Sequence, residues 1–255
     1  MTPALFEGQG VGIDRAGRSV LHDLDVQLPS HAWTCVVGPN GVGKSSLLRA
    51  LAGLLPVRGQ LRFEGDTRFL TDPAWRARRM AWLGQATQDD ASWRVGELAR
   101  MGRFPHGNAW HLTSAEDEHL VDDVLARLQL QALKHRRLDS LSAGQRQRAR
   151  LARLLCTQAP TLLLDEPVTH LDPPHQADWL VWAKQWVAQG GHLVTVLHEL
   201  PLALQADHLL VLHQGQCIHQ GSPTDATTRD AVVHAFDGRI EWVNHQGQWL
   251  SAWRS

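Results

Sequence analysis

The segment "GPNGVGKSS" (38–46) constrains the fold of this chain more than any other stretch. It matches the pattern G-x-x-x-x-G-K-[ST], which is known as a P-loop. The apolar run "WTCVVG" (33–38) precedes it, and the helix-periodic "KSSLLRALAGLL" (44–55) follows it. A buried strand, a glycine-rich loop and a helix in this order predict an α/β fold with a phosphate-binding loop.

The loop suggests how each of its residues could bind a nucleotide. Backbone N–H groups from Asn40 to Ser46 can surround phosphates, and glycines permit the tight turns that this requires. Lys44 would place its charge on the β- and γ-phosphates, and the Ser45 hydroxyl would bind Mg²⁺. The predicted ATP-binding residues of this loop are Gly38, Pro39, Asn40, Gly41, Val42, Gly43, Lys44, Ser45 and Ser46.

A second candidate site is "TLLLDEP" (161–167), an apolar strand that ends in two carboxylates. Adjacent acids at the end of a buried strand repel each other and are costly to bury unless a cation compensates them. Asp165 is therefore predicted to hold Mg²⁺, directly or through water. Glu166 is predicted to act as general base on the water that attacks the γ-phosphate.

Two further polar residues follow predicted strands. His198 ends the strand in "GHLVTVLHE" (191–199), and Gln85 ends the strand in "RMAWLGQ" (79–85). Ligands bind at the carboxyl ends of parallel strands in open α/β sheets. His198 could bond the γ-phosphate and orient the water, and Gln85 could reach Mg²⁺ or the water. Each residue alone could equally have no role in catalysis.

The rest of the chain alternates between strand and helix signals. Strands are predicted at 19–28, 59–65, 79–85, 161–167 and 191–199, and a helix at about 174–189, which implies a parallel sheet with crossover helices. Strand signals fade between about 93 and 157, where a helical block is predicted. Hairpins are predicted at 209–221, turning at Gln214-Gly215, and at 238–253, turning at Gln246-Gly247. Trp179, Trp182 and Trp186 are interpreted as a packing stripe.

Composition excludes several classes of protein. The net charge of −1 gives no basic excess for binding nucleic acid. Three distant cysteines form no CxxC pair, which fits a reducing compartment, and the 15 His residues show no metal-ligand spacing. The start "MTPALFEGQG" has no signal-peptide pattern, and no apolar run approaches the length of a membrane span.

Taken together, the motifs resemble those of the ATP-binding-cassette (ABC) ATPase family over nearly the whole chain. The match lies in "GPNGVGKS", Gln85, "LSAGQ" (141–145), "LLLDEP", "THLD" and His198, in the order of the family. The most specific of these is "LSAGQ" upstream of "LLLDEP". The resemblance implies ATP and Mg²⁺ as cofactors, with catalysis by Glu166, His198 and Gln85. The implied metal site is Ser45, Gln85 and Asp165.

The resemblance also implies how the chain is organised. A single domain, 1–255, would have a sheet core with an antiparallel β subdomain (1–85 and 158–255) and an inserted α-helical subdomain (86–157). The family works as a dimer in which each nucleotide is bound by both subunits. The residues implied to contact the nucleotide of the opposite subunit are Ser142, Ala143, Gly144, Gln145 and Asp172.

Two features depart from the family pattern. Ala143 replaces the first glycine of the usual "LSGGQ", which costs nothing only if its φ is negative. The family often stacks adenine on an aromatic residue in the first strand region. This chain has no Tyr, and "GVGIDRAG" (10–17) lies where that residue would be. No adenine-binding residue is therefore assigned.

A narrower resemblance concerns the type of transporter. "ELARMGRFPHGN" (97–108) and "GQCIHQGSP" (215–223) are similar to segments of importer ATPases for iron-siderophore, haem and vitamin B12 uptake. This implies a homodimer of ATPase subunits, an integral membrane permease and a substrate-binding protein as partners. It also implies a peripheral location on the cytoplasmic face of the inner (cell) membrane. No residue identifies the cargo, because an ATPase does not touch it.

By the same resemblance, residues 85–110 would line the groove that receives a helix of the permease. Phe104 and Trp110 could be exposed anchors there, whereas Trp93 is expected to pack in the subdomain core. Three alternatives stay open: a soluble ABC ATPase with a non-transport role, a transporter for another substrate, and a binding module without turnover. A permease gene beside this one would favour the importer.

Overall fold

The computed structural model describes residues 4–15, 17–84, 92–107, 114–169, 171–245 and 248–254. Its centre is a six-stranded sheet with the strand order β5-β6-β7-β3-β8-β9, in which β9 runs antiparallel to β8 and the other pairs are parallel. The strands are β3 (Trp33–Val37), β5 (Met80–Leu83), β6 (Thr161–Asp165), β7 (His192–Val196), β8 (His208–His213) and β9 (Gln216–Gly221). The predicted α/β fold with a mostly parallel sheet is confirmed.

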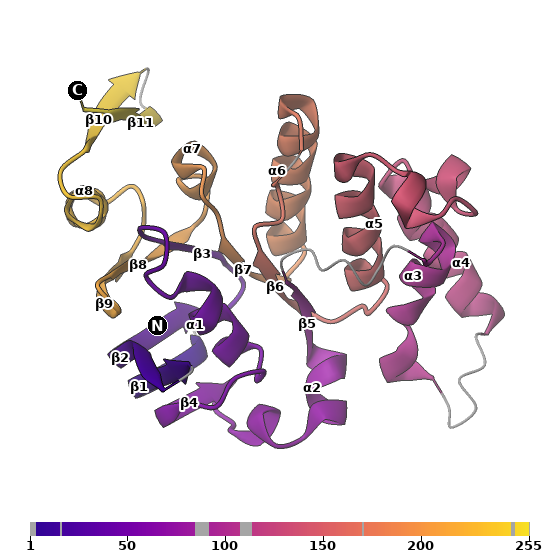
Figure 1. Ribbon diagram of the computed structural model, residues 1–255, viewed down its shortest axis with the longest axis horizontal. Coiled ribbons are helices and arrows are strands. Elements are labelled where there is room, and N and C mark those ends of the chain that lie inside the picture. Colours follow the sequence, from indigo (N-terminus) through magenta and orange to yellow (C-terminus); the bar gives the residue numbers. More distant parts are fainter. Residues whose placement is uncertain are drawn as a thin grey trace.

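The central strands are buried on both faces. Every residue of β3, β6 and β7 is buried, which explains why their sequences read as continuous apolar runs. Alternate residues enter two separate cores, so that Val36 packs with α1 (Lys44–Leu51), whereas Cys35 packs with residues of α5 (Ala143–Leu155) and α6 (Pro173–Ala188). Figure 1 shows α1 on one side of the sheet and α5 and α6 on the other.

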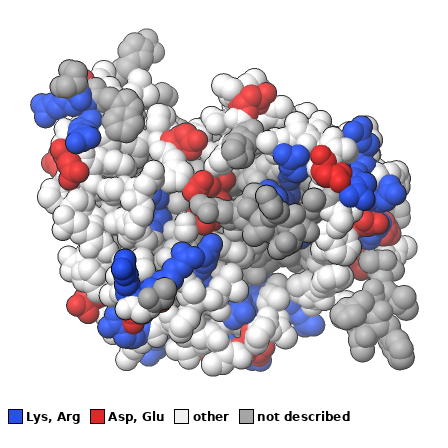
Figure 2. Space-filling model, viewed as in Figure 1, with Lys and Arg blue, Asp and Glu red and all other residues white. Residues whose placement is uncertain are grey.

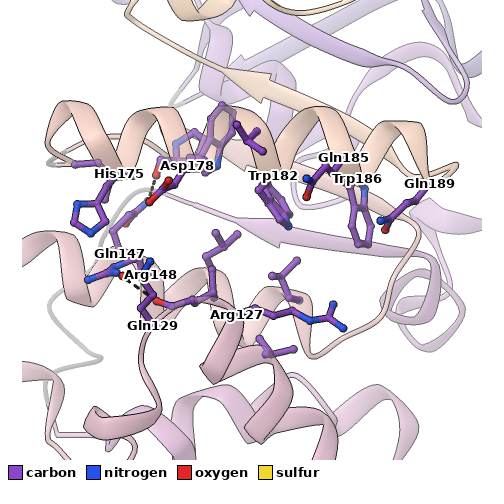
Figure 3. Close-up of a pocket in the computed structure, with 18 of the residues that line it drawn as sticks. Arg127, Gln129, Gln147, Arg148, His175, Asp178, Trp182, Gln185, Trp186 and Gln189 are labelled. Carbon is purple, nitrogen blue, oxygen red and sulfur yellow. Dashed lines mark hydrogen bonds between the residues drawn. The ribbon is translucent and has the colours of Figure 1, made fainter.

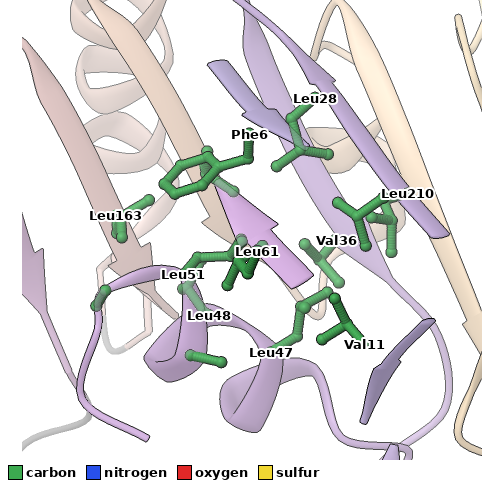
Figure 4. Packing of buried hydrophobic residues seen from close by; sticks show 14 of the residues in the cluster. Phe6, Val11, Leu28, Val36, Leu47, Leu48, Leu51, Leu61, Leu163 and Leu210 are labelled. Carbon is green, nitrogen blue, oxygen red and sulfur yellow. The ribbon is translucent and has the colours of Figure 1, made fainter. Parts of the chain in front are cut away.

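An antiparallel sheet covers α1 from the side opposite the central sheet, as the family resemblance implied. Its strand order is β2-β1-β4, with β1 (Ala4–Arg15), β2 (Arg18–Pro29) and β4 (Arg58–Phe63). Figure 4 shows the core between these layers, where Phe6, Leu28 and Leu61 lie near Leu47 and Leu51 of α1. This arrangement clamps the helix that follows the P-loop between two sheets.

Strand β1 was not predicted from the sequence. Three glycines and several register shifts interrupt its pairing with β2, so the apolar and polar residues do not alternate regularly. Its second half includes residues 10–15, which belong to the segment "GVGIDRAG" where the family often has an aromatic residue that stacks on adenine. Val11 and Ile13 are fully buried there, and the segment packs into the core.

The block between β5 and β6 is helical, as predicted. It contains α3 (Val95–Met101), α4 (Ala115–Arg127) and α5, which share a small apolar core of their own. Ser114 caps α4 in a capping box with Asp117. Trp93 is 41% exposed, so the expectation that it packs in this core is wrong, and Phe104 is 60% exposed. Trp110 lies outside the described residues.

Both predicted hairpins form. Gln214 and Gly215 turn the β8–β9 hairpin with φ of 47° and 77°, which is the conformation that a tight hairpin turn needs. The strands β10 (Ile240–His245) and β11 (Gln248–Trp253) pair with each other, while the predicted turn at 246–247 lies outside the described residues. Figure 1 shows this second hairpin at the far end of the molecule from α4.

The remaining α-helices are α2 (Pro73–Arg79), α7 (Leu200–Ala203) and α8 (Ala226–Ala235).

The predicted tryptophan stripe lies on α6. On α6, Trp179 is buried, and its ring packs edge-on against Trp33 at 5.5 Å. Trp182 and Trp186 are half-buried. The packing interpretation is confirmed for all three, because Trp182 and Trp186 pack against the same core cluster as Trp179, and their remaining surface borders a cavity.

On the face seen in Figure 2, Lys and Arg are interspersed with Asp and Glu. Among the described residues, no helix is both long enough and apolar enough to traverse a bilayer.

The packing around Trp33 yields a stability prediction. Trp33 is 1% exposed, and its Nε1 donates to Thr195 Oγ1 at 2.9 Å. Trp33→Ala should lower the free energy of unfolding by roughly 3–5 kcal/mol, through lost burial and a cavity. Urea denaturation measures the change. The control, Trp249→Ala in the C-terminal hairpin, should cost less because Trp249 is 37% exposed. Equal losses in both variants would contradict the assignment of Trp33 to the core.

Candidate active site

The P-loop connects β3 to α1 and depends on two glycines with positive φ. Gly38 has φ of 150°, and a Cβ there would lie 2.3 Å from the carbonyl oxygen of Leu212. Gly43 has φ of 109°, and its Cβ would lie 2.6 Å from Leu21 Cδ2. Neither position can hold a larger residue without moving its neighbours. The loop is thus held in one shape by the core beneath it.

Lys44 is the cation of the loop and is almost buried, with 5% of its surface exposed. Its Nζ donates to the carbonyl oxygens of Gly38 at 2.7 Å and Pro39 at 3.0 Å, so the side chain is folded over the loop. Burial lowers the pKa of Lys44, and the charges of Glu166 and Asp165 oppose that shift. The charged group is therefore placed where phosphate oxygens would meet the loop.

Ser45 and Asp165 meet although they are 120 residues apart in the sequence. The Ser45 hydroxyl donates to Asp165 Oδ1 at 3.0 Å. Burial raises the pKa of Asp165, the Ser45 hydrogen bond opposes this shift, and the nearby charge of Glu166 adds to it. Oδ2 of Asp165 is buried and has no hydrogen-bond partner among the described residues. A buried carboxylate oxygen without a partner needs a proton or a cation to compensate it.

These two side chains fit the predicted Mg²⁺ site. A hydroxyl and a carboxylate are hard oxygen ligands, and Mg²⁺ bound with a nucleotide usually takes few protein ligands, the others being waters and phosphate oxygens. No cluster of three or more His, Cys, Asp or Glu residues suited to a metal occurs in the described part of the chain. The hydroxyl of Ser45 and the carboxylate of Asp165 are few ligands, as expected for a cation that is bound together with a nucleotide. Gln85, the third predicted ligand, lies outside the described residues.

Glu166 and His198 form a direct pair at the ends of two neighbouring strands. His198 Nε2 lies 2.7 Å from Glu166 Oε1. Glu166 has φ of 54°, an uncommon conformation for a residue other than glycine, and its N–H donates to the carbonyl oxygen of Val196 at the end of β7. Thr169 Oγ1 donates to the second carboxylate oxygen at 3.3 Å. The general-base candidate is therefore held from both sides.

The signature turn, residues 142–145, begins α5. Ser142 is its N-cap: Ser142 Oγ accepts from the N–H of Gln145 at 3.2 Å, and Gln145 Oε1 accepts from the N–H of Ser142 at 3.0 Å. Ala143 is the first helical residue, and its φ is negative. The methyl group that replaces the usual glycine hydrogen therefore imposes no backbone strain.

Asp172 begins α6 in the same way. Its side chain accepts from the N–H of His175 at 3.3 Å and also pairs with the His175 ring. This hydrogen bond from the His175 side chain is the main reason that the pKa of Asp172 lies below its usual range. Asp172 is exposed, so it can still contact another molecule. Its predicted role in contacting a second subunit stays a prediction.

The structure brings some of the predicted residues together and keeps others apart. The P-loop, Asp165, Glu166 and His198 meet because β3, β7 and β6 are neighbours in the sheet and their carboxyl ends share one edge. The signature turn belongs to α5, which Figure 1 shows well away from α1 and the P-loop. Within one chain the turn therefore does not complete the nucleotide site.

One functional contact was missed by the sequence analysis. Gln147 Nε2, on α5, donates to the carbonyl oxygen of Pro167 at 3.0 Å. Pro167 directly follows Glu166, so this hydrogen bond attaches the signature helix to the loop that carries the general-base candidate of the same chain. No local pattern in the sequence marks the pair, because it depends on how two separate elements pack.

Comparisons with known proteins agree with this geometry. Residues 21–169 match the model of the ABC transporter family. The hemin import ATP-binding protein HmuV of Pseudomonas putida is 39% identical, over 93% of this chain and 95% of that protein. The ferric enterobactin transport ATP-binding protein FepC of Escherichia coli is 34% identical, over 91% and 87%.

A solved structure shares the fold. The dimeric structure of MJ0796, a bacterial ABC transporter cassette, superposes with a TM-score of 0.78 at 20% identity, covering 86% of this chain and 99% of that one. The family match covers more than half of the chain, and the P-loop, the strand-end acids and the histidine lie in one site, so the chain belongs to the ABC transporter family, as an ATPase subunit.

Proposed function

We propose that this chain is the ATP-hydrolysing subunit of an importer for a metal chelate or a related cofactor, such as haem, an iron-siderophore or vitamin B12. The observation that carries the ATPase part is the Glu166–His198 pair, 2.7 Å apart, beside the P-loop. The relatives that are named for hemin import and ferric enterobactin transport support the substrate class. The chain would work on the cytoplasmic face of the cell membrane with permease subunits and a substrate-binding protein.

Each residue has a task in the proposed hydrolysis. The P-loop N–H groups and Lys44 bind the phosphates of ATP, and Ser45 and Asp165 hold Mg²⁺. Bound there, Mg²⁺ would neutralise negative charge on the phosphate oxygens. Glu166 accepts a proton from the attacking water, and His198 holds the Glu166 carboxylate in place and is proposed to contact the γ-phosphate. Gln85 is proposed to position the water or the cation.

The signature turn is proposed to bind the nucleotide of a second copy of the chain. Ser142 Oγ uses an oxygen lone pair in the capping box, so its hydroxyl hydrogen stays available to an anion. The first N–H groups of α5, at Ala143 and Gly144, have no partner within the helix, and the helix dipole favours negative charge at this end. Gln145 and Asp172 would complete the contact. ATP would then hold two chains together, with the helical subdomain (86–157) carrying the closing surface.

Permease docking is proposed for the segment between Gln85 and Trp110, within which Trp93 and Phe104 are exposed. Exposed aromatic side chains are frequent anchors in protein interfaces. Two stretches of this segment, 85–91 and 108–110, lie outside the described part of the chain.

The catalytic assignment predicts the behaviour of Glu166→Gln. ATP hydrolysis should fall by two orders of magnitude or more, since the loss of one such group costs roughly 3 kcal/mol of barrier or more. With saturating ATP and Mg²⁺ the variant should be dimeric, because bound nucleotide is not consumed. Phosphate release and sedimentation velocity measure the two effects. Glu116→Gln, an exposed residue of α4, is the matched control and should keep wild-type turnover. A Glu166→Gln variant that remains monomeric would contradict the two-chain site.

The arrangement between subunits predicts a cross-link. Chains with Asn40→Cys are mixed with chains carrying Ser142→Cys, both in a Glu166→Gln, Cys217→Ser background; the two remaining cysteines are buried. A short bismaleimide should join the two kinds of chain only when ATP and Mg²⁺ are present. Either variant alone should give no such product. An equal yield without ATP, or none in the mixture, would refute the proposed contact between the signature turn and the P-loop of another chain.

The importer assignment predicts transport by the whole system. The chain, its permease and its binding protein are reconstituted in vesicles with ATP on the side of the ATPase. Uptake of hemin, a ferric siderophore or cobalamin should require ATP and should disappear with Glu166→Gln. Robust hydrolysis by the chain with no uptake of any of these would favour the alternatives, a non-transport ATPase or a transporter of another substrate.

A further inference from the structure

A cavity of about 860 Å³ lies between α6 on one side and α4 and α5 on the other (Figure 3). This volume is within the range of roughly 300–1,000 Å³ in which small-molecule sites fall. The P-loop, Asp165, Glu166 and His198 are not among its lining residues, so the cavity is separate from the nucleotide site. Gln147 and Pro167, whose hydrogen bond ties α5 to the catalytic loop, form part of its wall.

One wall of the cavity is aromatic. Trp182 and Trp186 lie on α6 with ring centroids 6.1 Å apart and planes inclined by 32°, and both line the cavity. Leu151 and Leu155 of α5 and Leu128, just beyond α4, supply aliphatic surface to the same cavity. Half-buried tryptophans facing leucines across open space favour a flat apolar ligand that can lie against the indole rings.

The charges of the lining are unevenly placed. Among the described residues that line the cavity, Arg127 and Arg148 are cationic and Asp178 is the one acid. The ring of His175, which also lines the cavity, is hydrogen-bonded to Asp172. In Figure 3, Asp178 lies toward one end of the cavity, next to Gln147 and His175. Arg127 lies toward the other end, opposite the part of α6 that carries Trp182 and Trp186. An anionic group is therefore favoured at the tryptophan end.

We propose that this cavity binds a planar aromatic carboxylate. Its ring would lie against Trp182 and Trp186, and its carboxylate would face Arg127. Because the ligand would touch α5 and α6 at once, it would bridge the helix that begins with the signature turn and the helix that begins with Asp172. The proposal concerns binding and does not depend on the transported substrate.

The test uses 2-naphthoate as the probe and isothermal titration calorimetry on the full chain. One molecule should bind per chain. The neutral analogue 2-naphthylmethanol should bind about tenfold more weakly or worse, because it lacks the charge that faces Arg127. Arg127→Ala should weaken naphthoate binding by a similar factor. Lys184→Ala removes a cation from the same helix as the tryptophans, but outside the cavity lining, and should leave binding unchanged.

Aromatic substitutions test the ring contact. Trp182→Leu should weaken 2-naphthoate binding about tenfold, and Trp182→Phe, which keeps a ring, should weaken it less. Trp249→Leu, in the distant C-terminal hairpin, should have no effect. Circular dichroism checks that each variant folds, and Arg127→Ala, at an exposed position, serves if Trp182→Leu does not fold. No binding to the wild-type chain at millimolar probe, or equal binding to Arg127→Ala, overturns the proposal. The proposal is also overturned if a helical peptide binds in the cavity and 2-naphthoate does not.

Discussion

The hydrogen bond from Ser45 to Asp165 is the contact on which the candidate active site depends. It joins the first turn of α1 to the end of β6, across 120 residues of sequence. Asp165 is 1% exposed, and a carboxylate buried this deeply must be compensated by polar or charged neighbours. Ser45 supplies one hydrogen bond, and the second carboxylate oxygen, which has no hydrogen-bond partner among the described residues, is the proposed ligand of a cation. The same geometry places Glu166, the next residue, beside the phosphate-binding loop.

The fold makes this contact possible by the order of its strands. β3, β7 and β6 are adjacent and parallel, so the loops that follow them emerge at one edge. The two sheets that enclose α1 hold the P-loop in place, and glycine is required where the loop passes Leu212 and Leu21. A rigid loop that faces two acids is suited to bind a phosphate together with a cation.

Most of the sheet core and of the site could be predicted because their signals are local. A glycine-rich loop between a strand and a helix, or acids at the end of an apolar strand, can be recognised within ten residues. The carboxyl-end rule for parallel strands predicts a ligand site at His198, and the structure places Asp165 and Glu166 at the end of the neighbouring strand. β1 escaped prediction because its glycines and bulges break the alternation. Two other features depend on how separate elements pack: the exposure of Trp93 and the hydrogen bond between Gln147 and Pro167. No local sequence pattern indicates how those elements pack.

The Gln147–Pro167 hydrogen bond has a consequence for a dimer of the proposed kind. The signature helix of each chain would close over the nucleotide of the other chain, while its Gln147 stays attached to the loop beside its own Glu166. Occupancy of one nucleotide site would therefore be felt at the general base of the other. Each nucleotide site would be coupled in this way to the general base of the other site. Hydrolysis in such a dimer would therefore be cooperative rather than a sum of two independent reactions.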